Sequence, residues 1–146
     1  MTLNVYLSGE IHSTWREQIA DGIAKAGLSV TLTAPVTNHE ASDNCGVNIL
    51  GEEASDFWKD HKAAKLNAIR TRNAIESADV VVVRFGEKYR QWNAAFDAGY
   101  AVALGKSLIV LHDPSLTHPL KEVDAAAMAV AEHPEQVVSI LEYVLQ

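Results

Sequence analysis

Apolar residues gather in four short runs, and each run has the length of a buried strand. They are LNVYLSG from Leu3 to Gly9, LSVTLTAP from Leu28, DVVVVRF from Asp79 and SLIVLHDP from Ser107. Four consecutive valines in the third run leave no polar face, which is typical of a strand covered on both sides in a parallel sheet. A weaker run at Ala127–Ala131 predicts a marginal fifth strand.

Segments with a helical period lie between these runs. The spacing predicts helices over 14–26, 59–77, 92–104, 120–124 and 134–145. Thr14 and Glu17 have the spacing of a capping box, and Gly27 is a signal for the end of the first helix. The region from Val36 to Trp58 is polar and acidic and shows no clear period. It predicts a lid or partner-contact loop with room for one short helix.

Strand, helix and strand follow one another within the first 35 residues, so these strands should be parallel. Continued along the chain, the pattern predicts one α/β domain over 1–146. We expect a doubly wound five-stranded parallel sheet of flavodoxin-like order 2-1-3-4-5 in three α/β/α layers. Ligands of such sheets bind beyond the carboxyl ends of the first and third strands. That edge should gather Ser8, Gly9, Glu10, His12, Arg84, Tyr89, Arg90 and Gln91.

Composition is that of a soluble globular protein, at 48% hydrophobic and 21% charged residues. No apolar run is long enough to span a bilayer, and the N-terminus lacks the pattern of a signal peptide. A single cysteine, Cys45, excludes an internal disulfide. These features predict a cytoplasmic protein without a membrane partner.

The net charge of −7 argues against general affinity for nucleic acid. Eight of the twelve basic residues nevertheless lie in the middle of the chain. The five from Lys59 to Arg72 are interpreted as a solvated helix face, whereas Arg84 and Arg90 flank a strand end and a helix start. His39, Glu40, Asp43 and Cys45 match no zinc or calcium ligand spacing, so we predict no metal site.

Several ligand-binding motifs are absent. The first strand is not followed by G-x-G-x-x-G, and the chain contains neither a Walker loop nor a G-x-S-x-G elbow. The third strand ends at Arg84, where a phospho-receiver domain would need an acidic residue. We therefore predict neither a dinucleotide nor another organic cofactor.

Asp97 is the only charged residue between Ala94 and Leu104. Helical spacing places it in line with Arg90, Asn93 and Tyr100, on a side that leads back to the expected crevice. The neighbouring side, Trp92, Phe96, Gly99 and Ala103, is predicted to pack on the sheet. Burying a lone carboxylate costs several kcal/mol unless it is paired. Asp97 therefore belongs either to a structural network, for example with Arg90, or to chemistry, and the residues alone leave both open.

Three stretches resemble the nucleoside 2-deoxyribosyltransferase superfamily, namely NVYLSG, SADVVVVRF and AAFDAGYAVALGKSLIVL. Two stretches resemble its YtoQ branch more closely, namely SGEIHSTWREQI and RQWNAAFDAGYA. The signature of the superfamily resembles D-x-G-T-x-x-E-x-G-x-A-x-x-x-G-K. In this sequence its glutamate falls on Asp97, its first aspartate on Gln91, and its Gly-Thr pair on Asn93 and Ala94.

The resemblance implies a carboxylate nucleophile that attacks the anomeric carbon of a sugar and expels the base, followed by transfer to another base or to water. Asp97 would be this nucleophile. A second carboxylate of the family falls on Asp79, and an aromatic of its first strand falls on Tyr6. Glu10 and His12 are candidates for acid-base work, and Arg84 and Arg90 for holding a phosphate.

The leading hypothesis is thus an enzyme acting on the N-glycosidic bond of a small nucleoside or nucleotide, with Asp97, Glu10, His12 and Asp79 as candidate catalytic residues. The predicted substrate-binding residues are Tyr6, Ser8, Gly9, Arg84, Tyr89, Arg90, Gln91 and Asn93. The alternative is a non-catalytic module that binds a nucleotide or nucleotide sugar. The resemblance also implies a homo-oligomer, because sites in this superfamily often use residues of a neighbouring subunit.

Overall fold

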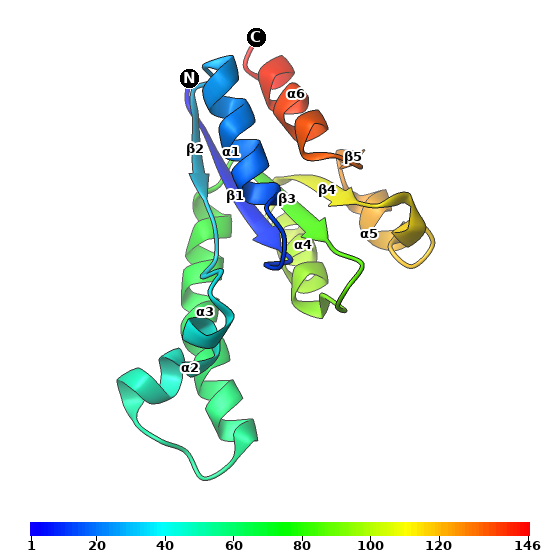
Figure 1. Ribbon diagram of the computed structural model, residues 1–146. Coiled ribbons are helices and arrows are strands. Elements are labelled where there is room, and N and C mark those ends of the chain that lie inside the picture. Colours follow the sequence, from blue (N-terminus) through cyan, green and yellow to red (C-terminus); the bar gives the residue numbers. More distant parts are fainter.

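A computed structural model describes residues 1–146 (Figure 1). Its five strands are β1 (Leu3–Gly9), β2 (Val30–Thr33), β3 (Val80–Phe85), β4 (Ser107–His112) and β5 (Ala129–Ala131). Its helices are α1 (Trp15–Ala26), α2 (His39–Leu50), α3 (Asp56–Ser77), α4 (Trp92–Ala103), α5 (Lys121–Ala126) and α6 (Pro134–Val144), with a 3₁₀ turn at Pro114–Leu116. No helix combines the length and the apolar character that crossing a membrane would need.

The five strands form one parallel sheet of order β2-β1-β3-β4-β5. The predicted strand order and three-layer architecture are therefore confirmed. Strand β1 lies between β2 and β3, with Ser8 opposite Val83 and Gly9 opposite Arg84. The chain leaves β1 and β3 toward opposite edges of the sheet, so the topological switch point lies between these two strands.

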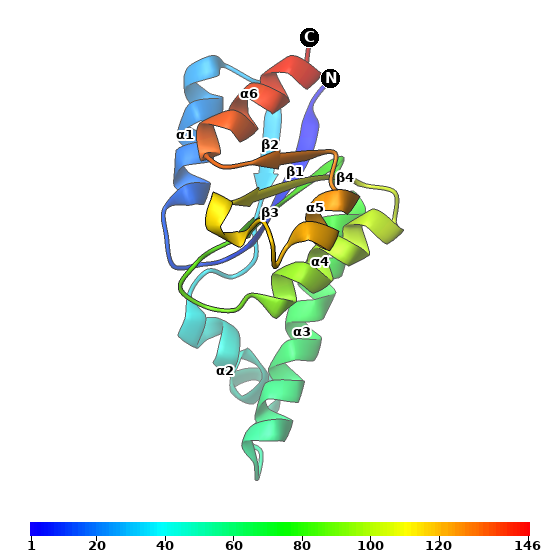
Figure 2. The same ribbon diagram turned by 90° about the vertical axis from the view of Figure 1, so that its right-hand side faces the viewer.

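Alternate strand residues build two separate cores, as the two-residue period of a strand requires. Leu7, Val82 and Leu111 belong to a cluster completed by α1 and α6. Val81, Val83 and Val110 belong to the other cluster, which is completed by residues of α3 and α4. Figure 2 shows α1 and α6 on one side of the sheet and α3, α4 and α5 on the other.

The region from Val36 to Trp58 is mostly helical, which corrects the prediction of a loop. It contains the 12 residues of α2 and the start of α3. Asn38 caps α2 by accepting the Ala41 N–H at 2.8 Å, and Ser55 caps α3. Because α2 packs chiefly on α3, it has only one fully buried residue, Gly46, and its hydrophobic period is weak. Figure 1 shows the α2–α3 pair extending away from the sheet.

Two predictions about helix faces and caps are wrong in detail. The Thr14 hydroxyl accepts from the Gln18 side chain instead of forming a capping box with Glu17. On α4 the residues that pack on the sheet are Ala94, Ala98 and Ala101, not the predicted aromatic stripe. Trp92 is 73% exposed and Phe96 67% exposed. The three alanines are small enough to bring α4 close to the sheet, which turns the larger side chains outward.

Candidate functional site

A crevice of about 710 Å³ opens on the α3–α4 side of the sheet, beyond the carboxyl end of β1. Residues 6 and 8–12 form its floor, α4 and the loop before it form one wall, and α2 and α3 form the other. Its position matches the crevice expected beside the switch point. Its volume lies within the range of pockets for small organic ligands.

Asp97 lies in this crevice and has a single hydrogen-bond partner. Ser8 Oγ donates to Asp97 Oδ2 at 2.6 Å. The contact arises because Ser8, like Tyr6 two residues earlier, faces the side of the sheet that α4 covers. None of the four ion pairs in the chain includes Asp97, so the pairing with Arg90 that the sequence left open does not occur within this chain.

The electrostatics of the crevice follow from this partial burial. Burial raises the pKa of Asp97, and the hydrogen bond from Ser8 acts in the opposite direction. Burial also raises the pKa of the Tyr6 phenol, and the nearby Asp97 carboxylate raises it further. A partly desolvated carboxylate without a cation is a weakly solvated anion, and it is free to interact with a ligand.

Glu10 is buried, and its side chain holds the loop between β1 and α1 in place. Its Oε1 accepts from Arg84 Nε at 3.2 Å and from the Ser13 hydroxyl, and its Oε2 accepts the His12 N–H at 2.7 Å. Both oxygens are therefore occupied within the protein. These contacts hold the Glu10 side chain in place at the crevice floor, and its role in acid-base work stays a prediction.

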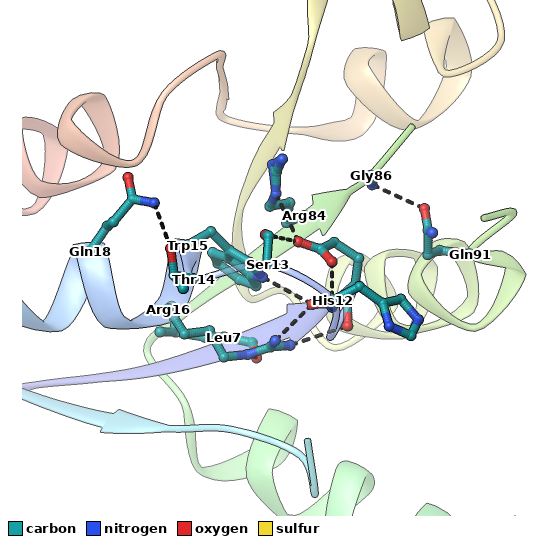
Figure 3. Close-up of polar contacts among 12 residues, drawn as sticks. Leu7, His12, Ser13, Thr14, Trp15, Arg16, Gln18, Arg84, Gly86 and Gln91 are labelled. Carbon is teal, nitrogen blue, oxygen red and sulfur yellow. Dashed lines mark hydrogen bonds and ion pairs between the residues drawn. The ribbon is translucent and has the colours of Figure 1, made fainter. Parts of the chain in front are cut away.

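Arg16 is a buried cation that the sequence did not reveal. Its guanidinium donates to three carbonyls at the end of β1, those of Leu7 at 3.0 Å, Glu10 at 2.7 Å and Gly9 at 3.1 Å (Figure 3). Burial lowers its pKa, and the Glu10 carboxylate opposes this effect. Arg16 follows a helix start in a polar stretch, so no periodicity distinguished it from a solvated arginine. It fixes the backbone from which Ser8 projects.

We expect Glu10→Gln to lower the free energy of unfolding by about 2 kcal/mol, because it weakens charge-assisted hydrogen bonds in a buried place. Chemical denaturation would measure the loss. Glu17→Gln, on the exposed first turn of α1, is the matched control and should change stability by less than ~0.5 kcal/mol. Equal losses in the two variants would contradict the structural role of Glu10.

Most of the predicted site residues line the crevice, and two do not. Those that line it are Tyr6, Ser8, Gly9, Glu10, His12, Tyr89, Arg90, Gln91, Asn93 and Asp97. Arg84 lies outside the lining because its side chain turns to Glu10. Asp79 precedes β3, at the opposite end of that strand, and accepts the Asn4 N–H at 2.8 Å. The predictions of a phosphate-binding Arg84 and a catalytic Asp79 are therefore not supported by their positions.

The outer wall of the crevice was missed by the sequence analysis. It includes Asn67, Arg70, Thr71 and Arg72 from α3. The signal for it was the excess of basic residues in this stretch, which we interpreted as a solvated face. This part of α3 faces the site only through the tertiary packing of α3 beside the end of β1, which the sequence does not reveal.

Aromatic rings stand at the mouth of the crevice. The rings of His12 and Tyr89 lie 4.7 Å apart and are tilted by 53°, and the Arg90 guanidinium lies 5.9 Å from the Trp92 ring. Trp92 and Phe96 also line the opening while remaining exposed. Exposed aromatics at a crevice can stack on a flat ligand. No group of three or more histidine, cysteine or carboxylate side chains that could hold a metal ion is present.

Comparison with known sequences gives a match along nearly the whole chain. Residues 6–145 match the family described as nucleoside 2-deoxyribosyltransferase YtoQ. The chain is 44% identical over 146 residues to the uncharacterized protein YtoQ of Bacillus subtilis (strain 168), which covers 100% of this chain and 99% of that protein.

Two solved structures are similar in fold. A conserved protein from Enterococcus faecalis V583 has a TM-score of 0.68 and 14% identity, over 99% of this chain and 100% of that one. A 2-deoxyribosyltransferase from Bacillus psychrosaccharolyticus has a TM-score of 0.54 and 18% identity, over 94% of this chain and 95% of that one. At such identities the likeness concerns the fold alone, and it agrees with the flavodoxin-like α/β architecture.

Proposed function

The chain belongs to the nucleoside 2-deoxyribosyltransferase YtoQ family, and on this premise we propose that its crevice cleaves the N-glycosidic bond of a nucleoside or nucleotide. The observation that carries the proposal is the Asp97 carboxylate, which is partly buried in the crevice and held only by the Ser8 hydroxyl at 2.6 Å. A carboxylate without a cation is suited to attack an electrophilic carbon.

In the first step Asp97 attacks the anomeric carbon as the carbon–nitrogen bond breaks, and the electron pair of that bond leaves with the base. His12 supplies a proton to the base. Its ring lines the crevice and makes no hydrogen bond within the chain, although its main-chain N–H is held by Glu10. Water or a second base then attacks the same carbon, breaks its bond to Asp97 and returns a proton to His12.

The crevice offers contacts for both parts of such a substrate. The hydroxyl and amide groups of Ser8, Asn93 and Gln91 lie near the carboxylate end, where a sugar would bind. Tyr89 and Trp92 stand at the mouth, where a flat base could stack.

The test is incubation of the protein with a panel of nucleosides and 5′-nucleotides, with and without acceptor bases. Chromatography would detect free or exchanged base, and mass spectrometry of the quenched protein would detect a sugar ester on Asp97. We expect release or exchange with at least one substrate. The absence of turnover across the whole panel would reject the proposal.

Ser8→Ala should move the acid limb of the pH profile of kcat/KM to higher pH. The Ser8 hydrogen bond holds the pKa of Asp97 down, so its removal leaves burial unopposed. The nucleophile must be ionised, and its ionisation would then need a higher pH. Rate measurements across the acid range would show the shift. An unchanged acid limb would mean that Asp97 is not the group titrating there.

A non-catalytic nucleotide-binding module is the second candidate. Gln91 favours it, because Gln91 Oε1 already accepts the Gly86 N–H at 3.0 Å and an amide cannot serve as a general acid (Figure 3). Here calorimetry would detect saturable binding without any product. Asp97→Asn would weaken that binding.

We also propose self-association of the chain. It is supported by the large apolar side chains that remain exposed on α4 and on the α2–α3 pair, namely Trp92, Phe96, Ile49, Leu50, Phe57 and Trp58. Light scattering coupled to gel filtration should give a mass of at least two chains of 15.9 kDa. A monomer at all concentrations would contradict this.

A further inference from the structure

Three guanidinium groups line the crevice from two sides. Arg70 and Arg72 come from α3, and Arg90 comes from the loop before α4. The same lining carries four carboxylates, Glu10, Asp43, Asp60 and Asp97. Arginine side chains at a crevice can bind the oxygens of an anionic ligand, provided that the protein does not already pair them with carboxylates.

These arginines have no carboxylate partner in the protein. The four ion pairs are His39–Asp43, Lys62–Glu53, Arg84–Glu10 and His112–Asp124. Of the four carboxylates that line the crevice, Glu10 is paired with Arg84 and Asp43 with His39, whereas Asp60 and Asp97 are in none of these pairs. The guanidinium groups of the three arginines are therefore free to bind a ligand.

The arginines also lie near the carboxylate that we propose as the nucleophile. Tyr6 is influenced by both charges, since Asp97 raises its pKa and Arg70 lowers it. Tyr100 lies one helical turn beyond Asp97 on α4; its hydrogen bond to Glu76 raises its pKa, and the nearby Arg72 charge opposes this rise. Arg70 and Arg72 are therefore close enough to the Asp97 end of the crevice for their charges to act on Tyr6 and Tyr100.

We propose that the substrate carries a phosphate monoester on its sugar, bound by Arg70, Arg72 and Arg90, and that it is a nucleoside 5′-monophosphate. This proposal rests on the N-glycosidic function proposed above. The planar guanidinium matches phosphate oxygens with two parallel hydrogen bonds, which an uncharged 5′-hydroxyl cannot provide. A 5′-phosphate belongs to the same sugar as the anomeric carbon, so it can reach the arginines while that carbon faces Asp97.

Binding is measured first, with Asp97→Asn protein so that no turnover occurs. Calorimetry compares 2′-deoxyadenosine with its 5′-monophosphate, and inorganic phosphate serves as the smallest probe. We expect the monophosphate to bind at least about tenfold more tightly than the nucleoside. Arg70→Gln and Arg90→Gln should each weaken monophosphate binding about tenfold or more.

Lys25→Gln, in the last turn of α1 and outside the crevice, removes the same charge and is the matched control. Equal binding of the two compounds, absence of phosphate binding, or an equal loss in Lys25→Gln would overturn the phosphate subsite. Turnover by the wild-type protein separates the two proposals. Base release that is indifferent to the phosphate and to both arginine variants rejects only the subsite. Arginine-dependent phosphate binding without any turnover rejects only the N-glycosidic function.

Discussion

Asp97→Asn is expected to lower the rate of base release by ~10³-fold or more. The amide keeps the size of the side chain and can still accept the Ser8 hydrogen bond, but it cannot form the covalent bond to the sugar. Kinetics with the best substrate of the panel would measure the loss. A variant that keeps more than about a tenth of the activity would show that Asp97 is not the nucleophile.

The same variant should not lose stability, and this separates a catalytic role from a structural one. Burial raises the pKa of Asp97 above its ordinary value of 3.8, so folding favours the protonated form. The stability from this group is fully present below that ordinary value and is lost as the pH rises through the raised pKa. Near neutral pH an amide removes this penalty. A loss of several kcal/mol on denaturation would instead indicate a structural network.

Asp97→Glu tests whether the site is built for the shorter side chain. Glutamate stands at this position in the signature that the sequence resembles, and it keeps the carboxylate. The crevice here holds the aspartate through Ser8 Oγ at 2.6 Å, and one more methylene displaces the charge from that contact. A displacement near 1 Å costs about 100-fold in rate. We therefore expect Asp97→Glu to be slow and still faster than Asp97→Asn.

The sheet could be predicted because its signals are local. The apolar run at Val80–Val83 can be accommodated only by a strand covered on both faces, and the alternation with helices fixes the parallel direction. That topology also predicted that residues at the end of β1 and in the first turn of α4 would line the crevice, because both elements meet at the switch point.

The errors have a common cause, since each concerned a side chain whose environment depends on another element. Helix α2 is held mainly by α3, through the close approach of Gly46 to the backbone of Ala63 and hydrogen bonds from Asn67 to Ser42. With one small buried residue and polar contacts, α2 shows little hydrophobic period in the sequence. The direction in which Arg84 points is decided by Glu10, more than 70 residues away in the chain. Asp79 matched a family position, but it lies at the start of β3, whose full length separates it from the crevice at the carboxyl end of the sheet.

Gly9→Ala is expected to lower the free energy of unfolding by roughly 4 kcal/mol. Gly9 has a φ of 113°, which alanine strongly disfavours, and an added Cβ would lie 2.1 Å from the Arg84 carbonyl oxygen. That oxygen also accepts the Glu10 N–H at 3.1 Å, so a shift of the oxygen weakens the hydrogen bond that holds the start of the β1–α1 loop. Thermal and chemical denaturation would measure the loss.

Gly27→Ala is the reference variant for Gly9→Ala. Gly27 ends α1 with a φ of 64° and has no atom within 4 Å of an added Cβ, so only the backbone conformation is penalised, at about 1 kcal/mol. The difference between the variants then combines the larger backbone penalty at the φ of 113° with the cost of separating β1 from β3 where Ser8 projects into the crevice. Base release should fall in Gly9→Ala even at temperatures where the protein remains folded. Similar stabilities of the two variants would mean that this close approach of the strands does not hold the site together.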